Sequence, residues 1–457
     1  MEGALYATLN STRGEIATTP TDAAFCGTDS DQLVAVGTLD GPLRLFSLKD
    51  RRGTLLREID TAQVSDGGQS PVTSVTSVSA VAGVDGGRGL CAAVGSLTKN
   101  STSSVQLFDV ETGEKIREMK MSESPSSDGT TDPNHATITR LVCLDGVFGN
   151  GHVVASGDDE GTVALWDARC STTVATCGRS DRSSPSSVMA LATLSPHTDY
   201  VTDIIPAPNS KKAILTTSGD GTLCLIDVRM TSNAYTLKLK HRTEDDNDDE
   251  LLSVACVRSG QKVVCGTTSG VLNVYSWGAW NDCSDRFPGH PDSVTSVIKV
   301  DEGTVVTGSS DGLLRVVGVQ PNRFLGVLGE HGTFDIERLV RSEGGHGRFL
   351  ASVSSLPGDA VKVWDMAVLF DDEDGDDDEG GDGNGNGDGD GNEKDGDIED
   401  GNADDSDDSD GSDGSEDAED RGKKKRRRKK ASRNKGAHKI PTKKATSAAD
   451  NFFSDLL

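Results

Sequence analysis

The first 370 residues alternate short apolar stretches with polar turns. The clearest unit is Val153–Arg169, VVASGDDEGTVALWDAR, in which two apolar runs flank the Asp/Gly-rich turn Asp158–Gly161. Glycine and aspartate let a chain reverse at little steric cost. The flanking β-branched residues favour strands over helices. The pattern therefore predicts a β-hairpin whose second strand ends at Trp166-Asp167.

The same hairpin pattern occurs at six other places in the chain. Aligned on the position of Trp166, the seven anchors are Phe46, Phe108, Trp166, Ile226, Tyr275, Val317 and Trp364. The repeat is somewhat longer on average than the ~40–45 residues of a WD repeat, and polar insertions account for the excess. Only Trp166-Asp167 and Trp364-Asp365 carry the literal Trp-Asp dipeptide. The chain resembles WD-repeat proteins, which implies an all-β fold: a seven-bladed WD-repeat β-propeller over residues 1–370.

The last repeat lacks its outer strand. Each blade needs four strands, but only a few residues separate Trp364-Asp365 from the acidic tract that begins at Asp371. Two short candidate strands, Ala4–Leu9 and Gly14–Thr18, precede the first repeat. We expect one of them to pair with Val361–Trp364 and close the ring without an open edge.

The composition changes abruptly after residue 370. Residues 371–420 contain 26 acidic residues and one lysine, and residues 421–444 contain 14 lysines and arginines and no acid. The acidic stretch has no hydrophobic period and cannot offset its ordering entropy, so we expect disorder there. The predicted organisation is a propeller (1–370), an acidic Asp/Gly-rich linker (371–420), a basic targeting segment (421–449) and a terminal aromatic peptide (450–457).

The cysteines and the N-terminal residues indicate an intracellular protein. The nine cysteines form no CxxC pair and mostly lie inside predicted strands, as expected of core residues in a reducing compartment. The first ten residues lack the basic and apolar regions of a secretory signal. No apolar run approaches the ~20 residues needed to span a bilayer, so no membrane association is expected.

No motif predicts an enzyme, a metal or a cofactor. Gly308–Gly312 fits the GxSxG nucleophile pattern, but a strand rather than a helix follows it. Asp382–Glu393 matches a calcium-loop expression without the flanking helices of an EF-hand. His290 and Asp311 are interpreted as partners in the internal hydrogen-bond network of a blade, where the turn aspartate bonds the histidine.

Two segments of the C-terminal tail are candidate functional sites. The run KKKRRRKK predicts nuclear localisation, with non-specific RNA contact as a further possibility. The terminal residues Phe452, Phe453, Leu456 and Leu457 would share one face of a helical turn and predict a docking peptide that orders against a partner. The residues of the localisation signal are Lys423, Lys424, Lys425, Arg426, Arg427, Arg428, Lys429 and Lys430.

The whole layout resembles the WD repeat-containing protein 55 family, the relatives of the fungal JIP5 protein. The resemblance rests on the degenerate repeats, the acidic linker, Lys423–Lys430 and the terminal Asn451–Leu456. It implies a non-enzymatic scaffold in the nucleus and nucleolus that acts in ribosome biogenesis and ribosomal RNA production. The implied partners are pre-ribosomal assembly factors bound to the propeller faces, with the protein a monomer inside a larger complex.

A second resemblance leaves an alternative function open. Trp166, Asp167 and Arg169 look like the WDxR box of substrate receptors that dock on the adaptor of a cullin–RING ubiquitin ligase. Asp227-Val228-Arg229 is a weaker copy without the tryptophan. An arginine just past the third strand of a blade can reach the propeller rim, although it can equally pair with acids of its own blade.

Overall fold

The computed structural model divides the chain into two units, Met1–Asp376 and Asp377–Leu457. All described residues belong to the first unit. The acidic linker, the basic segment and the terminal peptide lie outside them. The described residues are 4–10, 12–13, 16–17, 19–26, 33–49, 51–61, 71–78, 90–95, 104–120, 136–144, 153–168, 192–210, 212–231, 234–243, 249–342, 347–355 and 361–369.

Within these ranges the fold is all-β, as predicted: seven four-stranded antiparallel sheets and one two-stranded hairpin. The first sheet comprises β4 (Pro20–Cys26), β5 (Leu33–Thr38), β6 (Leu43–Ser47) and β7 (Thr54–Ile59). The second comprises β8 (Val72–Val78), β9 (Leu90–Gly95), β10 (Ser104–Asp109) and β11 (Lys115–Lys120). The third comprises β12 (Ile138–Cys143), β13 (Val153–Asp158), β14 (Val163–Asp167) and β15 (Ala192–Leu194).

The fourth sheet comprises β16 (Val201–Pro206), β17 (Ala213–Ser218), β18 (Leu223–Thr231) and β19 (Ala234–Arg242). The fifth comprises β20 (Leu251–Val257), β21 (Lys262–Thr267), β22 (Val271–Ser276) and β23 (Asp285–Pro288). The sixth comprises β24 (Val294–Lys299), β25 (Thr304–Ser309), β26 (Leu313–Gly318) and β27 (Arg323–Glu330). The seventh comprises β28 (Ile336–Arg341), β29 (Phe349–Ser354), β30 (Val361–Asp365) and β1 (Leu5–Leu9). The hairpin is β2 (Thr12–Arg13) with β3 (Ile16–Ala17), and a 3₁₀ turn, η2 (Met366–Leu369), follows β30.

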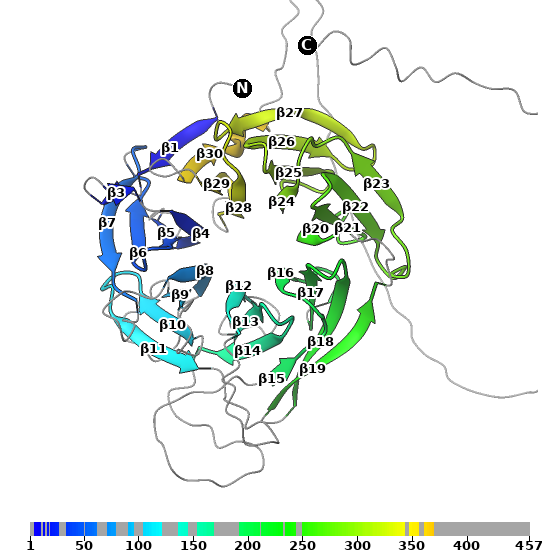
Figure 1. Cartoon of the computed structure of the whole chain (residues 1–457), viewed down its shortest axis with the longest axis horizontal. Coiled ribbons are helices and arrows are strands. Elements are labelled where there is room, and N and C mark those ends of the chain that lie inside the picture. Colours follow the sequence, from blue (N-terminus) through cyan, green and yellow to red (C-terminus); the bar gives the residue numbers. More distant parts are fainter. Residues whose placement is uncertain are drawn as a thin grey trace, which may run out of the picture. The chain divides into compact units, whose positions relative to one another are not determined.

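The sheets stand around a central axis as the blades of a propeller (Figure 1). The first strand of each sheet is innermost. These inner strands pack side by side in the cyclic order β4, β8, β12, β16, β20, β24, β28 and back to β4. The ring is therefore continuous through its inner strands.

The ring closes by pairing the two ends of the propeller chain. Strand β1 is antiparallel to β30, with Leu9 opposite Val361 and Ala7 opposite Val363. This confirms the predicted closure and identifies Leu5–Leu9 as the strand that forms it. The outer strand of the seventh sheet thus comes from the beginning of the chain.

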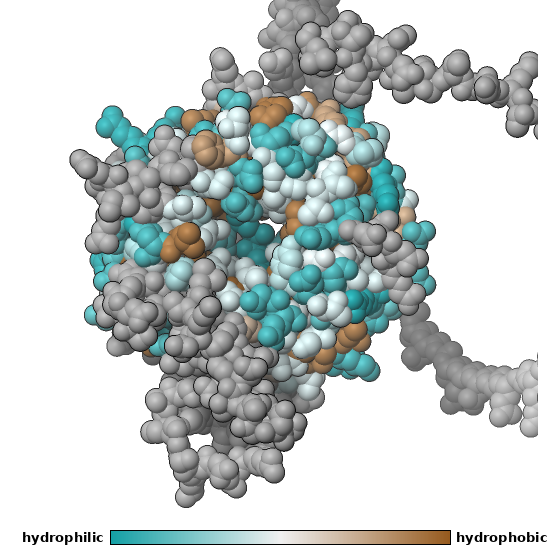
Figure 2. Space-filling model, viewed as in Figure 1, coloured by the Kyte–Doolittle hydropathy of each residue, from teal (hydrophilic) through white to brown (hydrophobic). Residues whose placement is uncertain are grey.

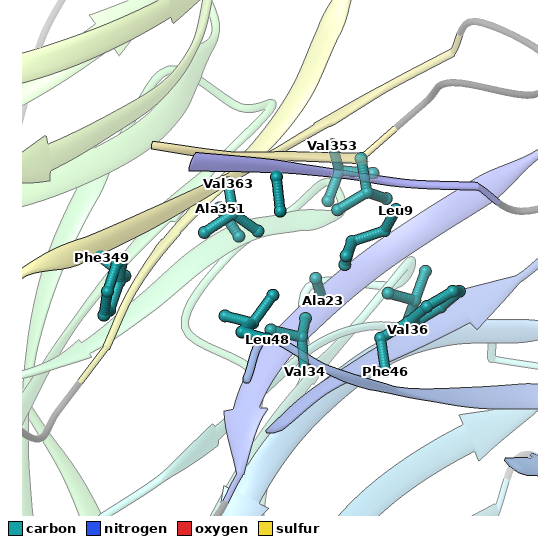
Figure 3. Packing of buried hydrophobic residues seen from close by; sticks show 12 residues of the cluster. Leu9, Ala23, Val34, Val36, Phe46, Leu48, Phe349, Ala351, Val353 and Val363 are labelled. Atoms are coloured by element: carbon teal, nitrogen blue, oxygen red, sulfur yellow. The ribbon is translucent and has the colours of Figure 1, made fainter. Parts of the chain in front are cut away.

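The hydrophobic core lies in layers between neighbouring sheets. Figure 3 shows one layer, in which Leu9, Val353 and Val363 of the seventh sheet face Val34 and Phe46 of the first. Side chains alternate along each strand, so each sheet contributes one face to the layer before it and one to the layer after it. This is why a second strand such as β5 (LVAVGT) reads as a nearly continuous apolar run.

Glycines on the second strand of a sheet set how closely the next sheet approaches. A Cβ on Gly157 of β13 would lie 2.5 Å from a methyl group of Val201, the first residue of β16. The same applies to Gly308 of β25 and Ile336 of β28, at 2.6 Å. The glycine of the repeat therefore serves inter-sheet packing, because a side chain there would push the neighbouring sheet away.

Candidate docking residues and the central charge network

Trp166 and Asp167 lie at the end of β14 and are both buried, with relative exposures of 0% and 5%. The Trp166 indole Nε1–H donates to Ser156 Oγ on β13 at 2.9 Å. In the folded sheet this tryptophan therefore holds the hairpin together and presents no contact surface. Arg169 lies outside the described residues, so its docking role stays a prediction.

The weaker WDxR copy shows how such an arginine is placed. Asp227 on β18 is 3% exposed and accepts hydrogen bonds from Arg229 and, at 3.0 Å, from Lys240 of β19. Burial alone would raise the pKa of Asp227, but the bonds from Lys240 and Arg229 outweigh it and lower the pKa. The Arg229 side chain is 66% exposed. The aspartate is thus structural, while the arginine after it reaches the rim.

The fourth sheet has the polar network expected of a WD repeat. The buried His197 ring places Nδ1 3.4 Å from the turn residue Asp220 and Nε2 2.8 Å from Thr216 Oγ1 on β17. Although burial opposes ionisation of Asp220, hydrogen bonds from His197, Thr222 and Thr198 lower its pKa below the ordinary range. The network satisfies buried polar groups and fixes the b–c turn, the turn between the second and third strands, against the segment before the sheet.

In the sixth sheet, the hydrogen bond predicted between His290 and Asp311 is not formed, so that prediction was wrong. The Asp311 carboxylate instead accepts hydrogen bonds from Arg315, four residues later, with 3.0 Å between Nη1 and Oδ1. His290 Nε2 contacts Thr307 Oγ1 at 2.9 Å. A guanidinium offers the carboxylate a charged, forked donor set, so it displaces the neutral imidazole.

A third network, in the seventh sheet, was missed by sequence reasoning. His331 Nε2 lies 2.6 Å from Ser352 Oγ, which also accepts the Trp364 indole N–H at 2.7 Å. A glutamate precedes His331, so this histidine lacks the Gly-His form that Gly289-His290 has before its inner strand. The position of His331 just before β28 was the available signal.

The third residue of every inner strand lies at an equivalent place around the central channel, which opens at the centre of the ring in Figure 2. Each inner strand has a register irregularity between its first and third residues. A β-bulge of this kind redirects a side chain. The seven residues, in order, are Asp22, Ser74, Arg140, Asp203, Ser253, Ser296 and Arg338.

Four of these residues form a charge network that spans the channel. Arg140 donates to Asp22 and to Asp203, each at 3.0 Å. Arg338 donates to Asp203 at 3.0 Å and places Nε 3.9 Å from Asp22. The carboxylates are 3–4% exposed and the guanidinium groups 12–13%. Two positive and two negative charges from the first, third, fourth and seventh sheets are thus balanced inside the ring.

Side chains at the same positions also accept hydrogen bonds from backbone amides of the next sheet. Asp22, with Oδ2 3.0 Å from the Val75 amide, and Ser74, with Oγ 3.1 Å from the Leu141 amide, accept from the sheet that follows. An arginine has no acceptor to offer. In the sheet that follows Arg140, the Ile204 amide therefore donates a hydrogen bond to the carboxylate of the preceding residue, Asp203, at 3.0 Å.

The same change of hydrogen-bond acceptor occurs in the sheet that follows Arg338. The Ala23 amide donates to Asp22 at 2.8 Å. Around the ring, each arginine is therefore followed by an aspartate. The carboxylate of that aspartate balances the charge of the arginine and accepts the backbone hydrogen bond that an arginine cannot accept. We infer this compensation from both occurrences.

A threonine at the second position of an inner strand ties each sheet to its neighbour in five of the seven cases. Thr21, Thr73, Thr139 and Thr202 donate to a main-chain carbonyl of the next inner strand at 2.5–2.6 Å, and Thr295 does so to Ile336. Leu252 and Glu337 occupy the other two positions. A threonine directly after the first residue of an inner strand thus encodes contact between sheets.

The chemistry of the channel is structural. Burial raises the pKa of Asp203, and the adjacent Arg140 opposes that rise. Within the described ranges no three His, Cys, Asp or Glu side chains are grouped so that they could hold a metal ion. No described helix is long and apolar enough to cross a membrane.

Comparison with known proteins reveals the family. The WD domain, G-beta repeat model matches residues 189–227 and 281–317. The WD repeat-containing protein 55 of Arabidopsis thaliana is 32% identical over 338 residues, covering 74% of this chain and 78% of that protein. The chain belongs to the WD repeat-containing protein 55/JIP5 family. The resemblance predicted from the sequence is therefore confirmed.

Two further relatives show how far the likeness extends. The WD repeat-containing protein 55 of Homo sapiens is 29% identical over 337 residues, 74% of this chain and 72% of that protein. The WD repeat-containing protein JIP5 of Coprinopsis cinerea is 39% identical over 228 residues, 48% of this chain and 49% of the relative. The chain thus spans about half the length of the fungal relatives it matches.

In this family member the matched repeats are offset from the sheets. The match at 189–227 begins before β15, the outer strand of the third sheet, and ends in β18 of the fourth. A repeat in sequence therefore links two neighbouring sheets. The same offset explains why β1, at the start of the chain, completes the seventh sheet.

The other predicted site residues lie outside the described ranges. These are the localisation run Lys423–Lys430 and the docking residues Phe452, Phe453 and Leu456. Their roles stay predictions.

Proposed function

We propose that the protein is a non-enzymatic WD-repeat scaffold of the nucleolus that acts in ribosome biogenesis and ribosomal RNA production. The carrying observation is that the conspicuous polar groups of the propeller, such as Arg140 with Asp22 and His331 with Trp364, are used to hold strands and sheets together. Because these groups are already used inside the propeller, partners would bind to its outer surface, which acts as a rigid platform. Family membership supports the same reading.

We also propose that the seven sheets act as seven blades of one closed ring. The repeat count in the sequence, the seven four-stranded sheets and the cyclic packing of the inner strands support this. A closed ring has no free sheet edge at the join between its ends. Pre-ribosomal assembly factors are the proposed partners of its faces.

The localisation proposal rests on Lys423–Lys430. Replacing these eight residues with alanine in a fluorescent fusion of the full chain should move the protein out of the nucleolus. Alanine at Lys435, Lys439, Lys443 and Lys444 gives a control that removes nearby cations outside the run. Unchanged nucleolar fluorescence of the eight-alanine variant would refute the assignment.

The scaffold proposal is tested at the terminal peptide. Phe452→Ala with Phe453→Ala should reduce co-sedimentation with pre-ribosomal particles in nuclear extract, because two apolar anchors are lost. Asp455→Ala is the matched control. If the double variant migrates with these particles as strongly as the wild type, the docking peptide is wrong.

A second candidate, docking on a cullin–RING ligase adaptor, is favoured by the exposure of Arg229 at the rim. The arginine of the full box is Arg169. Arg169→Ala should abolish co-purification of the adaptor and cullin and leave the fold intact. An adaptor that co-purifies equally with wild type and variant would eliminate this candidate.

A further inference from the structure

The outer parts of the fourth and fifth sheets form a surface where cations and aromatic rings meet. On β18, Ile226 and Val228 pack toward the third sheet, whereas Leu225 packs toward the fifth. Because side chains alternate along a strand, Asp227 and Arg229 also face the fifth sheet. These strands belong to the green part of the ring in Figure 1, where β19 and β23 are the outer strands of adjacent sheets.

Further cations lie on this surface. Lys238 is exposed and pairs opposite Asp227, and Lys240 reaches the same carboxylate. From the fifth sheet, exposed Arg286 on β23 pairs opposite Asn273. Asn273 alternates with Leu272 and Val274, which pack toward the sixth sheet, so Arg286 faces the fourth.

Aromatic rings form the floor between the two sheets. Trp280, 3% exposed, stacks with the exposed His241 ring at a centroid distance of 6.2 Å and an interplanar angle of 22°. Trp277 meets Trp280 edge-on at 5.1 Å and is half-buried. His241 lies opposite Leu225, which places it on the same side of the fourth sheet as Arg229. We call Arg229, Lys238, Lys240, His241, Trp277, Trp280 and Arg286 the blade 4–5 surface.

The charge of this surface is opposite to that of the protein. On the strand faces that form it, Arg229, Lys238, Lys240 and Arg286 accompany the carboxylate of Asp227. Exposed Asp282 lies in the loop that carries the two tryptophans, and the whole chain has a formal net charge of −28. Lysine and arginine beside a stacked aromatic ring are the groups that hold single-stranded nucleic acid: the cations meet phosphates, and an exposed ring face stacks on a base.

We propose that the blade 4–5 surface binds single-stranded RNA, with Lys238 and Arg286 on the phosphates and the outer face of His241 against a base. An acidic peptide would use the cations but gain nothing from the stacked imidazole. The assignment does not depend on nucleolar localisation or on the ligase alternative, so it can fail or hold separately from them.

The test measures RNA binding by the full chain. All variants carry alanine at Lys423–Lys430, which removes the competing basic run of the tail. Fluorescence anisotropy of a labelled oligouridine is followed at several salt concentrations. Lys238→Glu with Arg286→Glu should weaken binding at least about tenfold and reduce the salt slope by about 1.4, since each phosphate contact on a single strand contributes about 0.7. This pair leaves both partners of Asp227 in place.

The matched control reverses two cations on other outer strands. Lys115→Glu on β11 with Arg323→Glu on β27 changes the net charge equally and should leave the affinity within about twofold of the background. His241→Ala should weaken binding about fivefold or more with an unchanged salt slope, because it removes a stacking face and leaves every lysine and arginine of the surface in place. The melting temperature of each variant confirms folding.

Tryptophan fluorescence gives an independent readout. Trp166, Trp280 and Trp364 are 0%, 3% and 4% exposed, so quenching by oligouridine in the background protein reports Trp277, which is half-buried. Equal losses in the two double-charge variants would overturn the proposal, as would unchanged binding in Lys238→Glu with Arg286→Glu. Displacement of the RNA by polyglutamate at equal charge concentration would instead identify an acidic-peptide site.

Discussion

Arg338 on β28 donates a hydrogen bond to Asp203 on β16 at 3.0 Å, although the two residues belong to sheets that are not neighbours in the ring. The bond crosses the channel. With Arg140 and Asp22 it links four of the sheets through one set of buried charges. The ring is thus held at its centre as well as by packing between adjacent sheets.

Removing one arginine from this network should be costly. Arg338→Met leaves Asp22 and Asp203 buried with one guanidinium between them, and the loss of a buried partner typically costs about 3–5 kcal/mol. Chemical denaturation monitored by fluorescence measures it. Arg348→Met is the control, because Arg348 binds Asp365 with a side chain that is 50% exposed, and exposed pairs contribute about 1 kcal/mol or less. Equal effects of the two substitutions would contradict the channel assignment.

Ring closure predicts a contrast within β1. Leu9 is fully buried against the first sheet, whereas Leu5 is 48% exposed. Leu9→Ala should lower the free energy of unfolding by about 2–5 kcal/mol. Leu5→Ala should change it by about 0.5 kcal/mol or less. Similar melting temperatures for Leu9→Ala and wild type would mean that β1 does not close the ring.

The threonine ties can be tested one at a time. Thr73→Val keeps the side-chain shape but leaves the Ile138 carbonyl without its 2.6 Å bond. A loss of about 1 kcal/mol is expected. Thr73→Ser, which keeps the hydroxyl, should recover most of it. A valine variant as stable as wild type would show that the bond contributes nothing.

Buried histidines should make the protein sensitive to mild acid. Burial lowers the pKa of His331 from 6.5 to about 3, and the nearby charge of Lys362 acts in the same direction. The unfolded chain therefore binds a proton that the folded protein does not. The stability from neutral His331 is complete above pH 6.5 and is lost as the pH falls below it.

Comparison with His331→Gln isolates this contribution, because glutamine can still bond Ser352 and does not titrate. Between pH 7 and pH 5 the wild type should lose about 2 kcal/mol more than the variant, since one pKa unit corresponds to about 1.4 kcal/mol. Free energies of unfolding at the two pH values measure it. Parallel losses in both proteins would show that His331 does not titrate on unfolding.

Much of the fold could be predicted from the sequence because each hairpin of a propeller is formed by residues close together in the chain. The Asp158–Gly161 turn and its flanking β-branched runs specify a hairpin from neighbouring residues alone. The lack of residues for a fourth strand after Trp364 indicated that another part of the chain supplies this strand of the last sheet. The abrupt change in composition at residue 370 predicts a domain boundary there. None of these inferences requires knowledge of which sheets meet.

The channel network and the blade 4–5 surface were set by tertiary structure. In the channel network Arg140 lies 118 positions from its partner Asp22, and Arg338 lies 135 positions from its partner Asp203. Only closure of the ring brings these residues within hydrogen-bond distance. Asp311 binds Arg315 rather than His290 because a charged guanidinium is a stronger hydrogen-bond donor than a neutral imidazole. The spacing of these residues in the sequence does not show which donor is preferred. His241 meets Trp280 only because neighbouring sheets stand face to face. The sequence by itself determined the strands and their turns, which depend on short-range propensity. Pairing of charges and rings across sheets depends on distances that only the closed ring defines.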